Sequence, residues 1–151
     1  MNKEDVIVTL AVNAATLSKC KDKKTAAVLV SADFTQIHSV GINGGPRKGR
    51  QCLCGVKGDE ADQRGIKYTC AHSEMNCLVK NRVVDDTPKI LVCTKQPCQM
   101  CATLIINANT NIKEVWFSEP YWDKTGVQLL MDAGIIVKQI FLASDPEEVD
   151  G

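Results

Sequence analysis

The amino-acid sequence predicts an α/β fold: a single domain, residues 1–151, in which a mixed sheet of about five strands lies between layers of helices. In the second half of the chain, short apolar runs alternate with segments of helical spacing, and the connections are short. In the first half, a helical segment precedes two strand-like runs separated by a turn. Strand–helix–strand units form parallel pairs through right-handed crossovers, whereas a hairpin is antiparallel, so we expect a mixed sheet.

The first predicted elements are a helix over residues 3–19 and a hairpin. Strand-like runs over 26–30 and 37–42 are separated by Ser31-Ala32-Asp33, and Asn43-Gly44-Gly45-Pro46 ends the second run. The helix is predicted because apolar residues recur at helical spacing: Val6, Leu10, Ala14 and Leu17, with Ile7 and Ala11 beside them.

The segment over 43–70 shows no convincing periodicity and is rich in glycine and charge. A loop of this length inside a compact domain is uncommon and usually functional or mobile. We therefore interpret it as an insertion and a candidate regulatory region. At the other end of the chain, the acidic segment 144–151 is expected to be a flexible tail.

The second half supplies the alternation on which the fold class depends. Gly134 provides a good stop for the last helix. The predicted helices cover 72–81, 98–108 and 124–133, and the predicted strands cover 90–93, 112–117 and 135–140.

Composition excludes some classes of partner. Eighteen basic residues balance eighteen acidic ones, which disfavours a long nucleic-acid partner but is compatible with a small ligand that carries a phosphate. No apolar run approaches the ~20 residues of a membrane span, and the polar start does not resemble a secretory signal, so a cytoplasmic location is expected. In a reducing compartment, many of the eight cysteines are expected to be metal ligands or small buried residues.

Two short motifs carry the chemistry: His72-Ser73-Glu74 and Pro97-Cys98-Gln99-Met100-Cys101. Each lies where a helix is predicted to begin, and a helix N-terminus favours thiolate over thiol. Cys98 and Cys101 would form half of a zinc site, and His72 would be its third ligand. A fourth position left to water is typical of a catalytic zinc ion, and this order of motifs is the signature of zinc deaminases.

Glu74 distinguishes an enzyme from other zinc proteins. It can act as general acid and base, taking a proton from water and returning it to the ring and to the departing ammonia. A lone C-x-x-C could also be a redox motif, and the whole set could be a non-catalytic zinc module. Neither alternative needs a carboxylate beside an open metal position, so we favour the enzyme.

From about residue 18 to 140, the chain resembles the deoxycytidylate deaminase family of the cytidine deaminase superfamily. The resemblance implies the three-layer α/β/α cytidine deaminase-like fold, usually as a homohexamer. It also implies zinc-dependent hydrolysis of dCMP to dUMP and ammonia, which supplies the precursor of dTMP. It is carried by Gly41-Ile42-Asn43-Gly44-Gly45-Pro46, Cys70-Ala71-His72-Ser73-Glu74-Met75-Asn76, Tyr121-Trp122-Asp123 and Leu129-Leu130-Met131-Asp132-Ala133-Gly134-Ile135.

The resemblance also assigns binding residues. Asn43 would contact the sugar or phosphate of the nucleotide, Tyr121 would help to enclose the pocket, and Lys24 would lie near the phosphate. The long loop corresponds to the region where family members bind dCTP or dTTP as an allosteric effector, with which Mg²⁺ could be bound. The phosphates of that effector would meet Arg47, Lys48 and Arg50.

Some departures from the family pattern concern the substrate. Ser73 replaces the usual Ala, and Lys95-Gln96 is more polar than usual before Pro97. Another cytosine nucleotide, dCTP or a 5-substituted dCMP, is therefore the main alternative substrate. Deamination of adenosine in transfer RNA and deamination of guanine use a similar zinc motif and are rival activities. The zero net charge and the Asn-Gly-x-Pro turn argue against the transfer RNA substrate.

The remaining cysteines leave two interpretations. Cys52, Cys54 and Cys70 could form a second zinc site, with His38 as a fourth ligand, or they could be reduced thiols in a loop. The second interpretation is favoured because no fourth ligand is evident for a closed tetrahedral site. Cys20, Cys77 and Cys93 are expected to be ordinary buried residues.

Overall fold

The computed structural model of the chain describes residues 2–46, 51–55 and 69–141, and it contains every helix and strand that the sequence predicts. Within these ranges, no helix combines the length and the apolar character that a membrane span requires. The elements are, in order, α1 (Lys3–Ala15), β1 (Ala26–Ser31), β2 (Ile37–Ile42), α2 (Ser73–Lys80), β3 (Lys89–Lys95), α3 (Gln99–Asn107), β4 (Ile112–Glu119), α4 (Thr125–Asp132) and β5 (Ile136–Gln139).

The five strands form one sheet in the order β2-β1-β3-β4-β5. β1 is antiparallel to both of its neighbours, β2 and β3. The pairs β3–β4 and β4–β5 are parallel, and these are the strands that α3 and α4 connect. The predicted α/β class with a mixed sheet is therefore confirmed.

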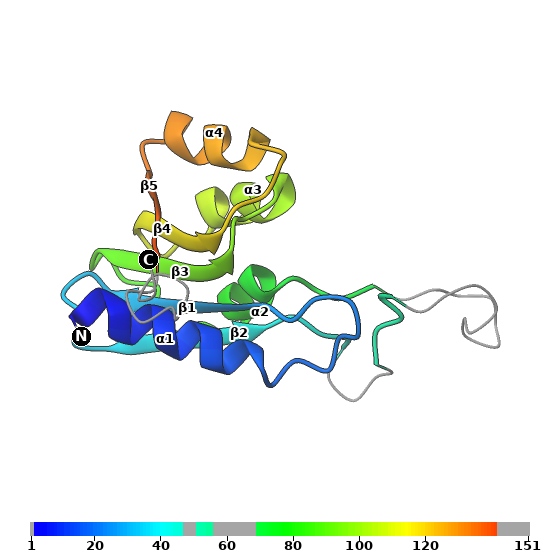
Figure 1. Cartoon of the computed structure of the whole chain (residues 1–151). Helices are drawn as coiled ribbons and strands as arrows, with labels where there is room; N and C mark the ends of the chain where they lie inside the picture. Colours follow the sequence, from blue (N-terminus) through cyan, green and yellow to red (C-terminus); the bar gives the residue numbers. More distant parts are fainter. Residues whose placement is uncertain (1, 47–50, 56–68, 142–151) are drawn as a thin grey trace, which may run out of the picture.

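Helices cover both faces of the sheet, α1 on one and α2, α3 and α4 on the other (Figure 1). Neighbouring residues of β1 point to opposite faces. Val28 and Val30 belong to the cluster under α1, and Ala27 and Leu29 belong to the cluster on the other face. All four are fully buried, which explains why this strand is a continuous apolar run without polar alternation.

The buried side of α1 differs in part from the sequence prediction. Val6 and Leu17, two residues of the predicted repeat, are 50% and 69% exposed. The helix also ends at Ala15, earlier than predicted, because its last turn tightens and Ser18 leaves to donate a hydrogen bond to the carbonyl of Asn43 at 2.9 Å. The residues of α1 that enter the core are Ile7, Val8, Ala11 and Ala15.

The carboxyl ends of β3 and β4 meet at one edge of the sheet, because these adjacent strands are parallel. There the N–H of Gln96, the residue after β3, donates to the carbonyl of Glu119, the last residue of β4, at 2.8 Å. This bond holds the ends of the two strands side by side. In open α/β sheets, ligands bind at this kind of edge.

α2 packs so closely on β2 that one position leaves no room for a side chain. A Cβ at Gly41 would lie 2.3 Å from the backbone N of Cys77 and 2.3 Å from the carbonyl O of Ser73. Both atoms belong to the backbone of α2 and cannot swing aside. Asn76 strengthens the contact, because its side-chain amide donates to the carbonyl of Ile42 at 2.7 Å. The helix that begins at Ser73 is thus fixed on the sheet by backbone contacts.

We expect Gly41→Ala to lower the free energy of unfolding by about 1–3 kcal/mol, because the methyl group forces β2 and α2 apart. Gly44→Ala is the matched control, since a Cβ at Gly44 meets nothing within 4 Å. Denaturant unfolding of the two variants measures the difference. Equal stabilities would contradict the close packing of α2 on β2.

Candidate functional site

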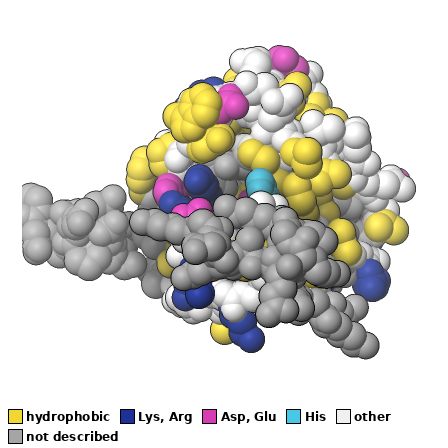
Figure 2. Space-filling model, turned by 90° about the vertical axis from the view of Figure 1, so that its right-hand side faces the viewer, with side chains coloured by type: hydrophobic (Ala, Val, Ile, Leu, Met, Phe, Trp, Pro, Cys, Tyr) yellow, Lys and Arg dark blue, Asp and Glu magenta, His cyan; other side chains and the backbone are white. Residues whose placement is uncertain are grey.

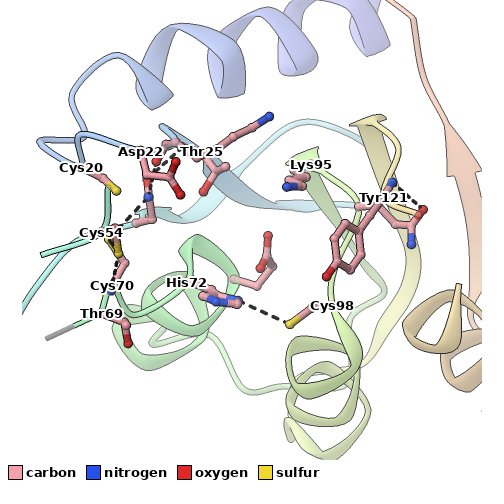
Figure 3. Close-up of a pocket in the computed structure, with 14 residues that line it drawn as sticks. Cys20, Asp22, Thr25, Cys54, Thr69, Cys70, His72, Lys95, Cys98 and Tyr121 are labelled. Atoms are coloured by element: carbon pink, nitrogen blue, oxygen red, sulfur yellow. Dashed lines mark hydrogen bonds between the residues drawn. The ribbon is translucent and has the colours of Figure 1, made fainter. Parts of the chain in front are cut away.

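The side chains of His72, Cys98 and Cys101 converge at the starts of two helices. His72 is the N-cap residue of α2, and Cys98 is the N-cap residue of α3, where its sulfur accepts a hydrogen bond from the N–H of Cys101 at 3.5 Å. The Nδ1 atom of His72 lies 3.4 Å from the sulfur of Cys98 and 3.3 Å from that of Cys101. Figure 3 shows His72 and Cys98 facing one another across the gap between the two helices.

The three donors fit a zinc ion. Around a tetrahedral zinc ion, imidazole nitrogen and thiolate sulfur lie about 3.6 Å apart, close to the distances found here. Burial, followed by the nearby carboxylate of Glu74, raises the pKa of the Cys101 thiol well above its ordinary value. A cation bound beside this sulfur would favour its thiolate form. Among the described residues, no fourth Cys, His, Asp or Glu joins this group, so one position of a tetrahedral ion would be open.

Glu74 lies in the first turn of α2, is 5% exposed and lines the same pocket as His72 and Cys98. Its Oε1 atom accepts a hydrogen bond from the hydroxyl of Ser73 at 3.1 Å, and that hydroxyl is within 3.2 Å of the Thr25 hydroxyl. The sequence marked Ser73 only as a departure from the family pattern. The structure shows that it is the hydrogen-bond partner of the buried carboxylate.

Both motifs open into one pocket of about 250 Å³. Its walls come from the segment after α1, from the turn after β2 and from the ends of β3 and β4. Lys23 and Lys95 line it, and Lys23 also forms an ion pair with Glu119.

The Lys and Arg side chains visible on the face in Figure 2 are scattered among other types, not joined into the stripe that a long nucleic acid needs.

The structure places two of the three predicted substrate-binding residues at the pocket. Asn43 and Tyr121 line it, whereas Lys24 is exposed and does not. The side chain of Asn43 also holds the neighbouring chain, because its Oδ1 accepts from the N–H of Thr25 at 2.9 Å and its Nδ2 donates to the carbonyl of Lys23 at 2.6 Å. The predicted regulatory residues Arg47, Lys48 and Arg50 lie outside the described residues, as does the tail from 144 to 151.

Gln96 positions the wall that carries Tyr121. Gln96 is 3% exposed, and its Oε1 accepts hydrogen bonds from the N–H of Tyr121 at 3.2 Å and from Lys124 Nζ at 2.8 Å. Its Nε2 donates to the carbonyl of Asp123 at 2.9 Å. Lys95, the preceding residue, places its ammonium 5.1 Å from the centre of the Tyr121 ring, a cation–π contact. The sequence showed only that Lys95-Gln96 is unusually polar. In the structure, the polar groups of both side chains contact Tyr121.

A second close backbone approach supports the motif with two cysteines. A Cβ at Gly126, in the first turn of α4, would lie 2.6 Å from the carbonyl O of Pro97 and 2.9 Å from that of Cys98. Glycine at this position therefore lets α4 press on the segment that begins α3.

A second group of cysteines adjoins the first. Cys20, Cys52, Cys54 and Cys70 lie within 4.8 Å of one another, measured between their sulfur atoms. The sequence-based preference for loop thiols relied on the lack of a fourth ligand, and this premise was wrong because Cys20 completes the group. His38 does not belong to it. Cys20 lies far from the others in sequence, so no local spacing could have revealed it.

Comparisons with known proteins give a consistent result. Residues 1–119 match the family model of the cytidine and deoxycytidylate deaminase zinc-binding region. No curated protein matches the chain. Among solved structures, dCMP deaminase from the cyanophage S-TIM5, in complex with dCMP and dUMP, is similar with a TM-score of 0.73 and 25% identity, over 91% of this chain and 96% of that one. The Rib2 deaminase of Aspergillus oryzae, in complex with DARIPP, shares the fold with a TM-score of 0.61 and 15% identity, over 99% and 95%.

We expect Ser73→Ala to lower deaminase turnover about fivefold with zinc content unchanged, since Glu74 loses a hydrogen bond worth about 1 kcal/mol. Thr103→Ala, which removes an exposed hydroxyl of α3, is the control. Steady-state ammonia release and zinc content check both variants. Wild-type turnover in Ser73→Ala would show that the hydroxyl does not support the carboxylate.

Proposed function

Because the chain belongs to the cytidine and deoxycytidylate deaminase family, we propose that it hydrolyses dCMP to dUMP and ammonia. The observation that carries the proposal is the pocket itself, where three metal donors with an open position adjoin a buried carboxylate. Similarity to the dCMP deaminase of cyanophage S-TIM5 over nearly the whole chain supports dCMP as the substrate. The reaction supplies the precursor of dTMP.

In this proposal His72, Cys98 and Cys101 hold the zinc ion and Glu74 moves the protons. When bound, zinc supplies a Lewis acid that lowers the pKa of a water molecule towards neutrality. Glu74 accepts a proton from the attacking water and delivers it to N3 of the cytosine ring as the new bond to C4 forms. It then carries the second proton to the amino group, so the C4–N bond breaks and ammonia leaves. The hydrogen bond from Ser73 holds this carboxylate in position for both transfers.

The walls of the pocket suit a nucleotide with one phosphate. Lys23 and Lys95 are the basic side chains that line it among the described residues, and we assign the 5′-phosphate to them; the predicted Lys24 does not line the pocket. Tyr121 carries an aromatic face into the same space. Asn43 lies where it can exchange an internal hydrogen bond for one to the sugar.

The finer features of the family stay predictions for this chain. They are allosteric control by dCTP or dTTP through Arg47, Lys48 and Arg50, Mg²⁺ with that effector, a homohexameric assembly and a cytoplasmic location. The polar pair Lys95-Gln96 keeps dCTP and 5-substituted dCMP as alternative substrates, because both residues line the pocket.

The test is ammonia release from purified protein with deoxycytidine, dCMP, dCTP, 5-methyl-dCMP, CMP, adenosine and guanine. We expect the highest kcat/KM for dCMP, and a much lower value for deoxycytidine because it lacks the phosphate. A preference for dCTP or 5-methyl-dCMP would select the alternative substrate. Turnover of none of these compounds by protein that contains zinc would overturn the proposal in favour of a non-catalytic zinc module.

The control variant in this assay is Glu74→Gln. It should keep its fold and its zinc but lose turnover at least about 100-fold, since general acid–base catalysis contributes about 10²–10⁴. Glu4→Gln changes an exposed carboxylate of α1 and should behave as wild type. Near-normal ammonia release by Glu74→Gln would remove Glu74 from the mechanism.

A further inference from the structure

The second cysteine group has the geometry of a metal centre. The sulfurs of Cys54 and Cys70 are 3.7 Å apart, and those of Cys52 and Cys70 are 2.9 Å apart. Four thiolates around a tetrahedral zinc ion lie about 3.8 Å from one another, and both of these separations lie within about 1 Å of that value. All eight cysteines are free, and no pair of them forms a disulfide.

A backbone N–H group points at one of these sulfurs, as such groups do around metal-bound thiolates. The N–H of Cys70 donates to the sulfur of Cys54 at 3.3 Å. Such bonds stabilise negative charge on sulfur, because a charge-assisted hydrogen bond is stronger than a neutral one.

The charge around Cys20 suits a site that is negative overall. Four thiolates leave a zinc centre with two net negative charges. Cys20 lies within a run of six residues that carries four lysines and one aspartate, Lys19-Cys20-Lys21-Asp22-Lys23-Lys24. This run of the chain therefore carries a net charge of +3, from four lysines and one aspartate.

We propose that Cys20, Cys52, Cys54 and Cys70 hold a second zinc ion in a closed site with four thiolate ligands. A tetrahedral set of four thiolates suits zinc, and a full set of protein ligands leaves no position for water. This zinc ion is therefore structural, in contrast to the open position beside Glu74. Its ligands come from the segment after α1, from residues 51–55 and from the residue two before His72.

The second site would build one wall of the substrate pocket. Cys20, Cys54 and Cys70 line that pocket and gather at one end of it, away from Cys98 (Figure 3). The amide of Asn43 lies 3.7 Å from the sulfur of Cys70, so a metal that fixes Cys70 also fixes a predicted substrate contact. The centre joins three chain segments that have no regular secondary structure at their contact.

Backbone contacts already bring those segments together. Gly55, with φ of +76°, packs on Asp22, and a Cβ there would lie 3.2 Å from the Asp22 Cβ. Gly44 and Ala71 exchange backbone hydrogen bonds at 3.2 and 2.9 Å. The cluster is thus framed on two sides by contacts that do not involve sulfur, which argues for a preformed site.

The test is zinc content per chain, measured by inductively coupled plasma mass spectrometry on reduced wild-type protein, with circular dichroism as a check of folding. We expect two zinc ions in the wild type and one in the double variant Cys98→Ser/Cys101→Ser, in which the proposed second site is intact. Cys54→Ser should also hold one, with a KM for dCMP raised at least threefold. Cys77→Ala, which removes a thiol outside both groups, should hold two.

The spectrum of the double variant loaded with Co²⁺ should be that of a tetrahedral centre with four thiolates. One zinc ion in the wild type, or none in the folded double variant, would overturn the proposal. So would a disulfide between Cys52 and Cys70 found by mass spectrometry in freshly purified protein. Where a variant does not fold, the wild-type count alone decides. These outcomes do not depend on turnover, so failure of the deaminase assay would leave this test intact.

Discussion

The convergence of an imidazole and two thiols at the starts of α2 and α3 is the constraint on which the rest of the structure depends. Neither helix can shift without separating His72 from Cys98 and Cys101. Each helix is therefore held by backbone contacts that leave no room for adjustment. Gly41 brings β2 against the backbone of α2, and Gly126 brings α4 against the segment before α3. Parallel pairing of β3 and β4 then sets the loops that line the pocket at the same edge.

A buried carboxylate beside that metal position is the second requirement, and it has an energetic cost. Removing an ionised group from water is unfavourable unless hydrogen bonds replace the lost hydration. The hydroxyl of Ser73 donates such a bond to Glu74. The hydroxyl of Thr25, the residue just before β1, donates in turn to the hydroxyl of Ser73. Thr25 is also joined to Asn43 and, through Cys70, to the second cysteine group. The carboxylate of Glu74 and the pocket wall thus share one connected set of polar contacts.

Sequence periodicity and motif spacing predicted most of this fold, because both are local properties. The strand and helix order, the mixed sheet and the two motifs at helix starts could all be found within short windows. Other features depend on tertiary contacts, which periodicity does not predict. Leu17 continues the apolar repeat of α1 yet is exposed, since the helix ends before it. Cys20 joins partners more than thirty residues away, and the bonds that Gln96 makes to the 121–124 segment depend on the pairing of β3 with β4.

The most direct test of a catalytic zinc ion between the starts of α2 and α3 is anomalous diffraction at the zinc absorption edge from crystals of the purified chain. We expect a peak about 2.3 Å from the sulfurs of Cys98 and Cys101 and about 2.0 Å from Nδ1 of His72, with solvent in the fourth position facing Glu74. A peak at this site with a fourth protein ligand would contradict a catalytic centre. The absence of any peak between the starts of α2 and α3 would contradict the assignment of the ligands.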